Sequence, residues 1–334
     1  MRGGSCTCEL SAAWRAACCT LLLAGGCRPN HAGLAAPSPT VAARQPQIFI
    51  ADWANHRVVR VTGLHGEDWT TCGESGPVDL RYPVGICLDS SGRLYVAEQE
   101  PRLHRLDQLY GAGWVTHQLE PEPNRPPNRH LGCWVCLDRS GRIYVSDGGR
   151  HRIVRIDDMS GAGRVSLGSA GSGERQFHHP AGVWVDSQDR LYVADFDNFR
   201  IVRCNDMQGT NWTELGRYGS GEREFINPAG ICIDSQGRIY VADQGNDRVV
   251  RIDDMRGANW TTVGSFGIGD APQRLYAPTG IAVDRAGRIY VTQCSSNHRL
   301  VRMDDMSGAN WTVFGGGGVG PGQFASPLGV FVRE

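Results

Sequence analysis

Residues 230–243 read GICIDSQGRIYVAD, and this pattern recurs about every 48 residues, a period typical of repeat architectures. Its first aspartate recurs at Asp89, Asp138, Asp186, Asp234 and Asp284. Its last position is occupied in turn by Asp52, Glu98, Asp147, Asp195, Asp243 and Gln293. The chain from residue 46 onward is therefore one repeated supersecondary unit rather than a string of unrelated segments.

Each unit is expected to contain four short strands. In the unit quoted above, these are residues 230–233 (inner), 238–242 (second), 248–252 (third) and a strand from 260 to 263 (outer). The inner segment is apolar at every position, as a strand buried on both faces must be, and the second is rich in branched and aromatic residues. A glycine-rich connector then leads to Pro278 and the next inner strand. Four-stranded units repeated radially are the blades of a β-propeller.

The two ends of the chain predict how the ring closes. The first unit begins at its second strand, residues 47–52, and lacks an inner strand. The last residues, 327–334, read PLGVFVRE and have the pattern of an inner strand with nothing after it. Joining them leaves no open sheet edge. The predicted fold is all-β: a six-bladed β-propeller of four-stranded blades, with the first blade closed by the C-terminal strand.

Four short motifs recur with the strands: Pro-x-Gly-Ile-x-Val-Asp, Tyr-Val-Ala-Asp, Asn-x-Arg-Val and Phe-x-x-Pro. The Asn-x-Arg triplet stands at residues 55–57, 198–200, 246–248 and 297–299. Together these motifs resemble the NHL repeat over nearly all of residues 46–334. The resemblance implies a six-bladed propeller, and NHL propellers often serve as interaction domains.

Residues that recur in every unit are expected to serve the unit. The repeated aspartates after the second strand should accept backbone N–H bonds in a loop. The arginine pairs on the third strands should answer carboxylates of neighbouring blades. Cys133 and Cys136 resemble a redox pair but occupy inner-strand positions, so we interpret them as core residues.

The charge composition excludes several functions. All 34 basic residues of the 334 are arginine, so no lysine is available for a Schiff base or a phosphate loop. The formal net charge is -1, which gives no basic excess for a nucleic-acid partner. Some NHL propellers bind RNA through a basic face, but RNA binding is not expected here.

The N-terminal region differs in composition from the repeats. Residues 1–27 combine early arginines with a short apolar stretch and resemble a signal peptide, and Cys27 resembles a lipoprotein lipidation site. Residues 28–45 are rich in alanine and proline and are typical of a tether. We therefore expect an exported monomer, periplasmic or at the cell surface, whose only membrane link is a possible N-terminal lipid anchor.

The propeller topology predicts where function lies. The loops between second and third strands and the connectors between blades should share one face, here called the loop face. The remaining turns, between inner and second strands and between third and outer strands, make up the turn face, whose sequence is monotonous. The loop face varies in sequence, and it holds these binding candidates: Trp53, His56, Glu98, Arg150, His151, Phe196, Phe199, Asp247 and His298.

Two classes of function remain open from the sequence. The first is a non-enzymatic module that binds a protein, peptide or glycan through the loop face. The second is a propeller enzyme with a metal in the central channel, similar to calcium-dependent lactonases or to amidating lyases, which hold zinc with three channel histidines. In the lyases one such histidine follows the inner-strand proline. The corresponding residues here are Val84, Cys133, Ala181, Ala229, Thr279 and Leu328. No catalytic residue, metal ligand or cofactor is assigned, although calcium stays possible.

Overall fold

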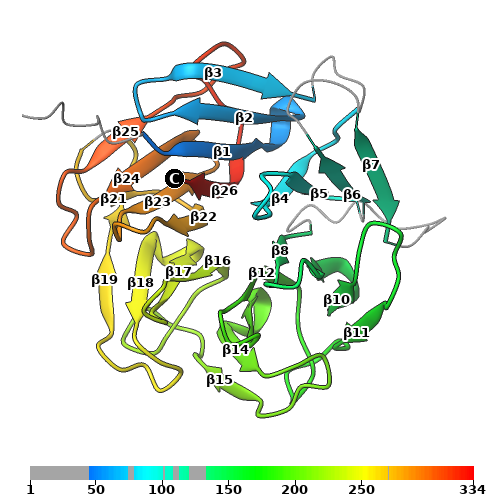
Figure 1. Cartoon of the computed structure of the whole chain (residues 1–334). Coiled ribbons are helices and arrows are strands. Elements are labelled where there is room, and N and C mark those ends of the chain that lie inside the picture. Colours follow the sequence, from blue (N-terminus) through cyan, green and yellow to red (C-terminus); the bar gives the residue numbers. More distant parts are fainter. Residues whose placement is uncertain (1–44, 74–78, 101, 108–112, 120–132, 270) are drawn as a thin grey trace, which may run out of the picture. The chain divides into compact units, whose positions relative to one another are not determined.

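Six antiparallel sheets of four strands are arranged as blades around a central axis (Figure 1). The computed structural model describes residues 45–73, 79–100, 102–107, 113–119, 133–269 and 271–334, all within one unit of residues 44–334. Residues 1–27 with Cys27, and the tether up to residue 44, lie outside the described residues. Within the described part, no helix is both long and apolar enough to span a membrane.

The strands of each blade follow the predicted order from the axis outward. The first three blades are β26 (Pro327–Arg333), β1 (Gln47–Asp52), β2 (Arg57–Thr62) and β3 (Glu67–Cys72); β4 (Pro83–Leu88), β5 (Leu94–Glu98), β6 (Arg102–Leu106) and β7 (Trp114–Gln118); and β8 (Val135–Leu137), β9 (Ile143–Asp147), β10 (Arg152–Ile156) and β11 (Val165–Leu167).

The last three blades repeat the same arrangement. They are β12 (Pro180–Val185), β13 (Leu191–Asp195), β14 (Arg200–Cys204) and β15 (Thr213–Leu215); β16 (Pro228–Ile233), β17 (Ile239–Asp243), β18 (Arg248–Ile252) and β19 (Thr261–Val263); and β22 (Pro278–Val283), β23 (Ile289–Gln293), β24 (Arg299–Met303) and β25 (Thr312–Phe314). A short parallel pair, β20 (Ser265–Phe266) and β21 (Arg274–Leu275), lies in the connector before the sixth blade.

The ring is closed as the sequence predicted. β26 pairs antiparallel with β1, with Ile48 opposite Val332 and Ile50 opposite Val330. In Figure 1 the last strand therefore lies beside the first. β26 also contacts the inner strands of the second and sixth blades, β4 and β22. The first blade thus contains both ends of the repeated region, and β1 is paired along both of its edges.

Glycine near the start of the inner strands allows neighbouring blades to approach closely. A Cβ at Gly182 would lie 2.5 Å from the carbonyl oxygen of Ala229 on the next inner strand, closer than real Cβ contacts come. The third blade departs from this pattern, because Trp134 stands where the other blades have glycine. Trp134 is 9% exposed and packs in a cluster with Val84 and Ala181 from the adjacent blades.

The apolar cores lie between successive blades. One cluster, for example, joins Tyr192 and Ile201 of the fourth blade to Ile231 and Val250 of the fifth. Cys133 and Cys136 are both buried and belong to apolar clusters, in agreement with their interpretation as core residues. Burial raises the pKa of the Cys136 thiol, which keeps it protonated and unreactive.

Candidate functional site

The loops between second and third strands and the connectors between blades lie together, as predicted. Four of these loops are single-turn 3-10 helices: η1 (Trp53–Asn55), η2 (Gly148–Arg150), η3 (Phe196–Asn198) and η4 (Gln244–Asn246). Backbone hydrogen bonds join η1, η3 and η4 to the adjacent connector. The amide of Asp197 in η3 donates to the carbonyl of His178 at 3.1 Å, and that of Gly245 in η4 to Ile226 at 2.8 Å. The loop face is therefore one continuous surface of the propeller.

In the first, fourth and fifth blades, a clamp of three side chains holds the connector against the blade that follows it. In the fourth blade, Asp195 accepts the backbone N–H of His178 at 2.7 Å, Nδ2 of Asn198 at 2.8 Å and Nε of Arg200 at 2.9 Å. Arg200 also donates to the connector carbonyls of Ser172 and Gln176. Burial raises the pKa of Asp195, and these hydrogen bonds oppose that rise.

The clamp explains the Asn-x-Arg signature and corrects one expectation. The same three residues occupy these positions in the first blade (Asp52, Asn55 and Arg57) and in the fifth blade (Asp243, Asn246 and Arg248). The aspartates accept backbone N–H bonds, as predicted. The arginines, however, pair with the aspartate of their own blade and reach the preceding connector through carbonyl groups. For Arg200 and Arg248, the prediction that they meet carboxylates of neighbouring blades was wrong.

Five loop-face positions share a left-handed backbone, and four of these side chains have a common partner. The five are His56, His151, Phe199, Asp247 and His298, with φ between 43° and 57°. Four of them accept the backbone N–H of the residue before an inner-strand proline. The donors are Tyr82 to His56 (3.2 Å), His179 to His151 (3.1 Å), Ala277 to Asp247 (2.8 Å) and Ser326 to His298 (2.8 Å).

The other predicted residues differ in accessibility. Trp53, Arg150, Phe196 and Phe199 are partly exposed on the loop face. Trp53 and Phe196 also pack against the apolar cluster that contains Trp134. Glu98 is 0% exposed, because it occupies the clamp position of the second blade beside Arg102 at 2.7 Å and His104 at 3.1 Å. It is therefore inaccessible to a partner.

The most exposed apolar side chains lie in the connectors, which the sequence analysis did not single out by residue. Among the described residues, all the large hydrophobic side chains that are exposed belong to connectors: Tyr82 (40%), Tyr218 (66%), Phe266 (67%), Ile268 (58%) and Val319 (66%). Tyr82 lies against Trp53 and His56, with ring centroids 4.8 and 4.3 Å away. Tyr218 lies edge-on to Phe199 at 5.0 Å. An aromatic residue just after the connector's first glycine was the signal available in the sequence.

The residues that follow the inner-strand prolines offer no ligand for a zinc ion of the lyase type. The six residues that follow the inner-strand proline position are buried, except for the partly exposed Leu328: Val84, Cys133, Ala181, Ala229, Thr279 and Leu328. None of them is a histidine or a carboxylate. The ring of histidines that a lyase-like zinc site needs is therefore missing from these six positions.

A cavity of about 770 Å³ lies on the turn face, lined by turns of the second to fifth blades. Its aspartates are already engaged within their own turns. Asp234, for example, accepts the backbone N–H groups of Gln236 and Arg238 through Oδ1, and Nε of Arg238 through Oδ2 at 2.6 Å. Asp89, Asp138 and Asp186 have the same bonds to their own arginines. Their charge is compensated locally, so a cation there would compete with arginine.

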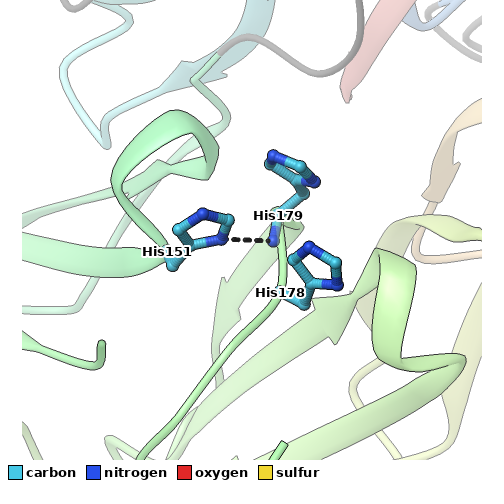
Figure 2. A group of neighbouring side chains, drawn as sticks. All are labelled: His151, His178 and His179. Carbon is cyan, nitrogen blue, oxygen red and sulfur yellow. Dashed lines mark hydrogen bonds between the residues drawn. The ribbon is translucent and has the colours of Figure 1, made fainter. Parts of the chain in front are cut away.

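Three histidines meet on the loop face between the third and fourth blades (Figure 2). His151 ends η2, while His178 and His179 end the connector before β12. One ring nitrogen from each lies within 4.8 Å of the others. The sequence analysis named His151 but assigned no metal ligands. The available signal was the adjacent pair His178-His179 directly before Pro180.

Comparison with known proteins gives both a family and a fold. The family model described as SMP-30/gluconolactonase/LRE-like region matches residues 36–265, and that of the NHL repeat matches residues 275–303. No curated protein matches the sequence. A solved nidogen/laminin complex is similar with a TM-score of 0.63 at 18% identity, covering 86% of this chain and 98% of that one.

Two further solved structures share the fold. A protein of unknown function from Bacteroides thetaiotaomicron has a TM-score of 0.56 at 17% identity, over 83% of this chain and 78% of its own. A streptogramin B lyase has a TM-score of 0.50 at 16% identity, and the match covers 69% of this chain and 67% of that one. At these identities the likeness concerns the fold alone. On its family match, the chain belongs to the SMP-30/gluconolactonase/LRE-like family and carries an NHL repeat.

Proposed function

We propose that the chain is a non-enzymatic binding module that takes a protein or peptide partner through its loop face. The observation that carries this proposal is the confinement of exposed large apolar side chains to the connectors of that face. Exposed apolar groups gathered on one side of a protein are typical of interaction surfaces. The described residues of the turn face offer no exposed apolar side chain of this size.

The mixture of side chains favours a polypeptide over a glycan. Tyr218 and Phe266 are accompanied by the aliphatic Ile268 and Val319, each more than half exposed. Protein partners bury aromatic and aliphatic groups together, whereas aliphatic side chains offer a sugar ring neither a stacking face nor a hydrogen bond. The proposal therefore narrows the partner from protein, peptide or glycan to the first two.

The clamps support this function by holding the connectors in place before binding. Arg200 and Asn198 fix the connector before the fourth blade, and Arg248 and Asn246 fix the connector that contains Tyr218. A surface that is already ordered loses less conformational entropy when a partner binds. Most of the conformational entropy lost on binding is then lost by the partner.

An enzyme is the second candidate, and one observation favours it: the turn-face cavity at the end of the channel, in a chain whose family name includes gluconolactonase. Two observations argue against an enzyme. None of the six residues after the inner-strand proline is a histidine or a carboxylate, and the aspartates of the cavity are already paired with arginine. A lactone-hydrolysis assay on the full chain, with and without calcium, separates the two. Turnover above the uncatalysed rate that is lost on chelation would favour the enzyme.

The binding proposal is tested with peptides selected from a displayed library on the immobilised full chain. The dissociation constant of a selected peptide is then measured for the wild type, for the double variant Tyr218→Ala/Phe266→Ala and for Arg256→Ala. Arg256 is an exposed residue of a turn-face loop, with its side chain 92% exposed, and serves as the control. The double variant should weaken binding at least tenfold, and the control should leave it unchanged.

Three results would contradict the proposal. The first is that no peptide is selected, and the second is that selected peptides bind the double variant as tightly as the wild type. The third is a glycan, found on an array, whose binding is lost in the same double variant. That last result would keep the loop face but replace the polypeptide partner.

A further inference from the structure

We propose that His151, His178 and His179 form a binding site for a divalent transition-metal ion of the zinc class. This inference does not depend on the proposed function. Among the described residues, these three form the only group of histidine, cysteine or acidic side chains gathered closely enough to hold a metal. The site lies on the loop face, and none of its three histidines occupies one of the six positions that follow the inner-strand proline.

The blade repeat explains His151 but not the other two histidines. The left-handed position of His151 is filled by His56 and His298 in other blades, where each accepts the same backbone N–H. The positions of His178 and His179, by contrast, hold Ile226 and Asn227 in the following connector. The last two connectors have Tyr276-Ala277 and Ala325-Ser326 there. A pair of histidines at this point serves no requirement of the fold.

The backbone of the cluster is fixed before any ion arrives. His179 has a left-handed backbone with φ of 51° and is followed by Pro180, and its N–H donates to Nδ1 of His151 at 3.1 Å. The backbone N–H of His178 is held by Asp195 at 2.7 Å. Only the imidazole rings need to move to bring their nitrogens closer. A tetrahedral zinc site separates its nitrogen ligands by about 3.4 Å, so the movement from 4.8 Å is small.

A carboxylate prepares His179 as a ligand. Its Nδ1 lies 2.5 Å from Oδ2 of Asp197, and Asp197 in turn accepts Nδ2 of Asn227 at 3.1 Å. Because a carboxylate accepts, Nδ1 of His179 carries the proton, and Nε2 is the nitrogen that has the lone pair. Ligating histidines in metal sites commonly have this outer carboxylate. The position of Asp197 holds alanine or glycine in three other blades (Ala54, Gly149 and Gly245).

His151 and His178 complete the donor set. The edge of His151 that carries Nδ1 faces the other two residues in Figure 2, and that nitrogen has the lone pair because it accepts an N–H. Coordination there would replace one hydrogen bond. His178 is exposed and contributes from the solvent side.

The chemistry of three imidazole ligands sets the class of ion. Imidazole nitrogen suits zinc, copper and nickel, whereas calcium and magnesium prefer oxygen ligands. Three protein ligands leave a fourth position open, and here it would face solvent and hold water. The site would therefore be an open one rather than a closed structural zinc site.

The test is a calorimetric titration of the full chain with zinc chloride alone, on the wild type, His178→Ala, Asp197→Asn and the control His65→Ala. His65 is another exposed histidine, in the turn between β2 and β3. Cysteines elsewhere in the chain can also take zinc, so the result lies in the difference between variants. Thermal unfolding of each metal-free variant checks that it folds, and His178→Gln replaces His178→Ala if the latter does not.

The wild type and His65→Ala should bind one more zinc ion than His178→Ala. Asp197→Asn should bind it about 10- to 100-fold more weakly, as loss of an outer carboxylate commonly does. Cobalt substituted into the wild type should show a visible absorption band that His178→Ala lacks. If all four proteins bind the same number of zinc ions with the same affinity, the site does not exist.

Discussion

Val330 gives a quantitative test of how the ring is closed. Its side chain is 7% exposed and lies in a cluster that joins Ile48 and Ile50 of the first blade to Tyr290 and Leu300 of the sixth. The substitution Val330→Ala removes two methyl groups from this cluster. At about 0.8 kcal/mol per buried carbon, with a contribution from the cavity that remains, the free energy of unfolding should fall by about 2 kcal/mol.

The matched control is Val319→Ala, the same chemical change at a side chain that is 66% exposed. It should change the free energy of unfolding by less than about 0.5 kcal/mol. Both are measured by urea denaturation, followed by tryptophan fluorescence and by circular dichroism. A domain of this kind is stabilised by about 5–15 kcal/mol, so a change of 2 kcal/mol is easily resolved.

Deletion of residues 327–334 extends the same test. In the intact chain, β26 pairs with β1. The deletion removes β26, the inner strand of the first blade, and leaves that edge of β1 open. We expect the single cooperative transition to be lost, because the first and sixth blades no longer share a core. If Val330→Ala and Val319→Ala unfold alike, or if the truncated chain keeps the wild-type midpoint and slope, the closure described here is wrong.

Three further substitutions test individual contacts. Gly182→Ala should lower the free energy of unfolding by about 1–3 kcal/mol through overpacking, because the added Cβ meets the next inner strand. A Cβ at Gly316 would meet open space, so Gly316→Ala should be nearly neutral in the same urea titration. Arg200→Ala should lower the free energy of unfolding by about 3–5 kcal/mol, because buried Asp195 loses its cation. The control Arg217→Ala removes an arginine whose side chain is 77% exposed and pairs with Glu224, and should cost less than about 1 kcal/mol. Equal effects of the two variants would contradict the clamp. Burial, and to a smaller extent Arg164, lowers the pKa of His117, so the folded state favours its neutral form. The free energy of unfolding should therefore decline as the pH falls below about 6.5. Unfolding midpoints measured against pH should show that His117→Gln flattens this decline and that the control His65→Gln does not.

Much of the fold was predictable because each blade repeats the same physical solution. Asp234 and Asp243 mark fixed positions in a unit, so comparison of units located strands, turns and the closing strand without any tertiary information. The loop face was predictable for the same reason. The exception at Trp134 shows the limit of the method: a repeat states what most blades need, and one blade can fill a glycine position with a large side chain when its neighbours make room.

The candidate site was less predictable because it depends on what differs between blades. Glu98 looked like an accessible acid on a variable loop, yet its position is the buried clamp position shared with Asp195. His151 and His178 are far apart in sequence, and they meet only because a left-handed residue turns the loop back toward the connector. The exposure of Tyr218 and Phe266 depends on connector geometry that the alternation of apolar residues does not encode.

The central claim is that the loop face is the binding surface, and hydrogen–deuterium exchange of the full chain tests it most directly. Exchange is compared with and without a saturating amount of a selected peptide. The account predicts protection in the connectors that contain Tyr218, Phe266 and Val319 and no change in the turn of residues 234–237. Protection confined to that turn and its counterparts around the turn-face cavity, with the connectors unchanged, would contradict it.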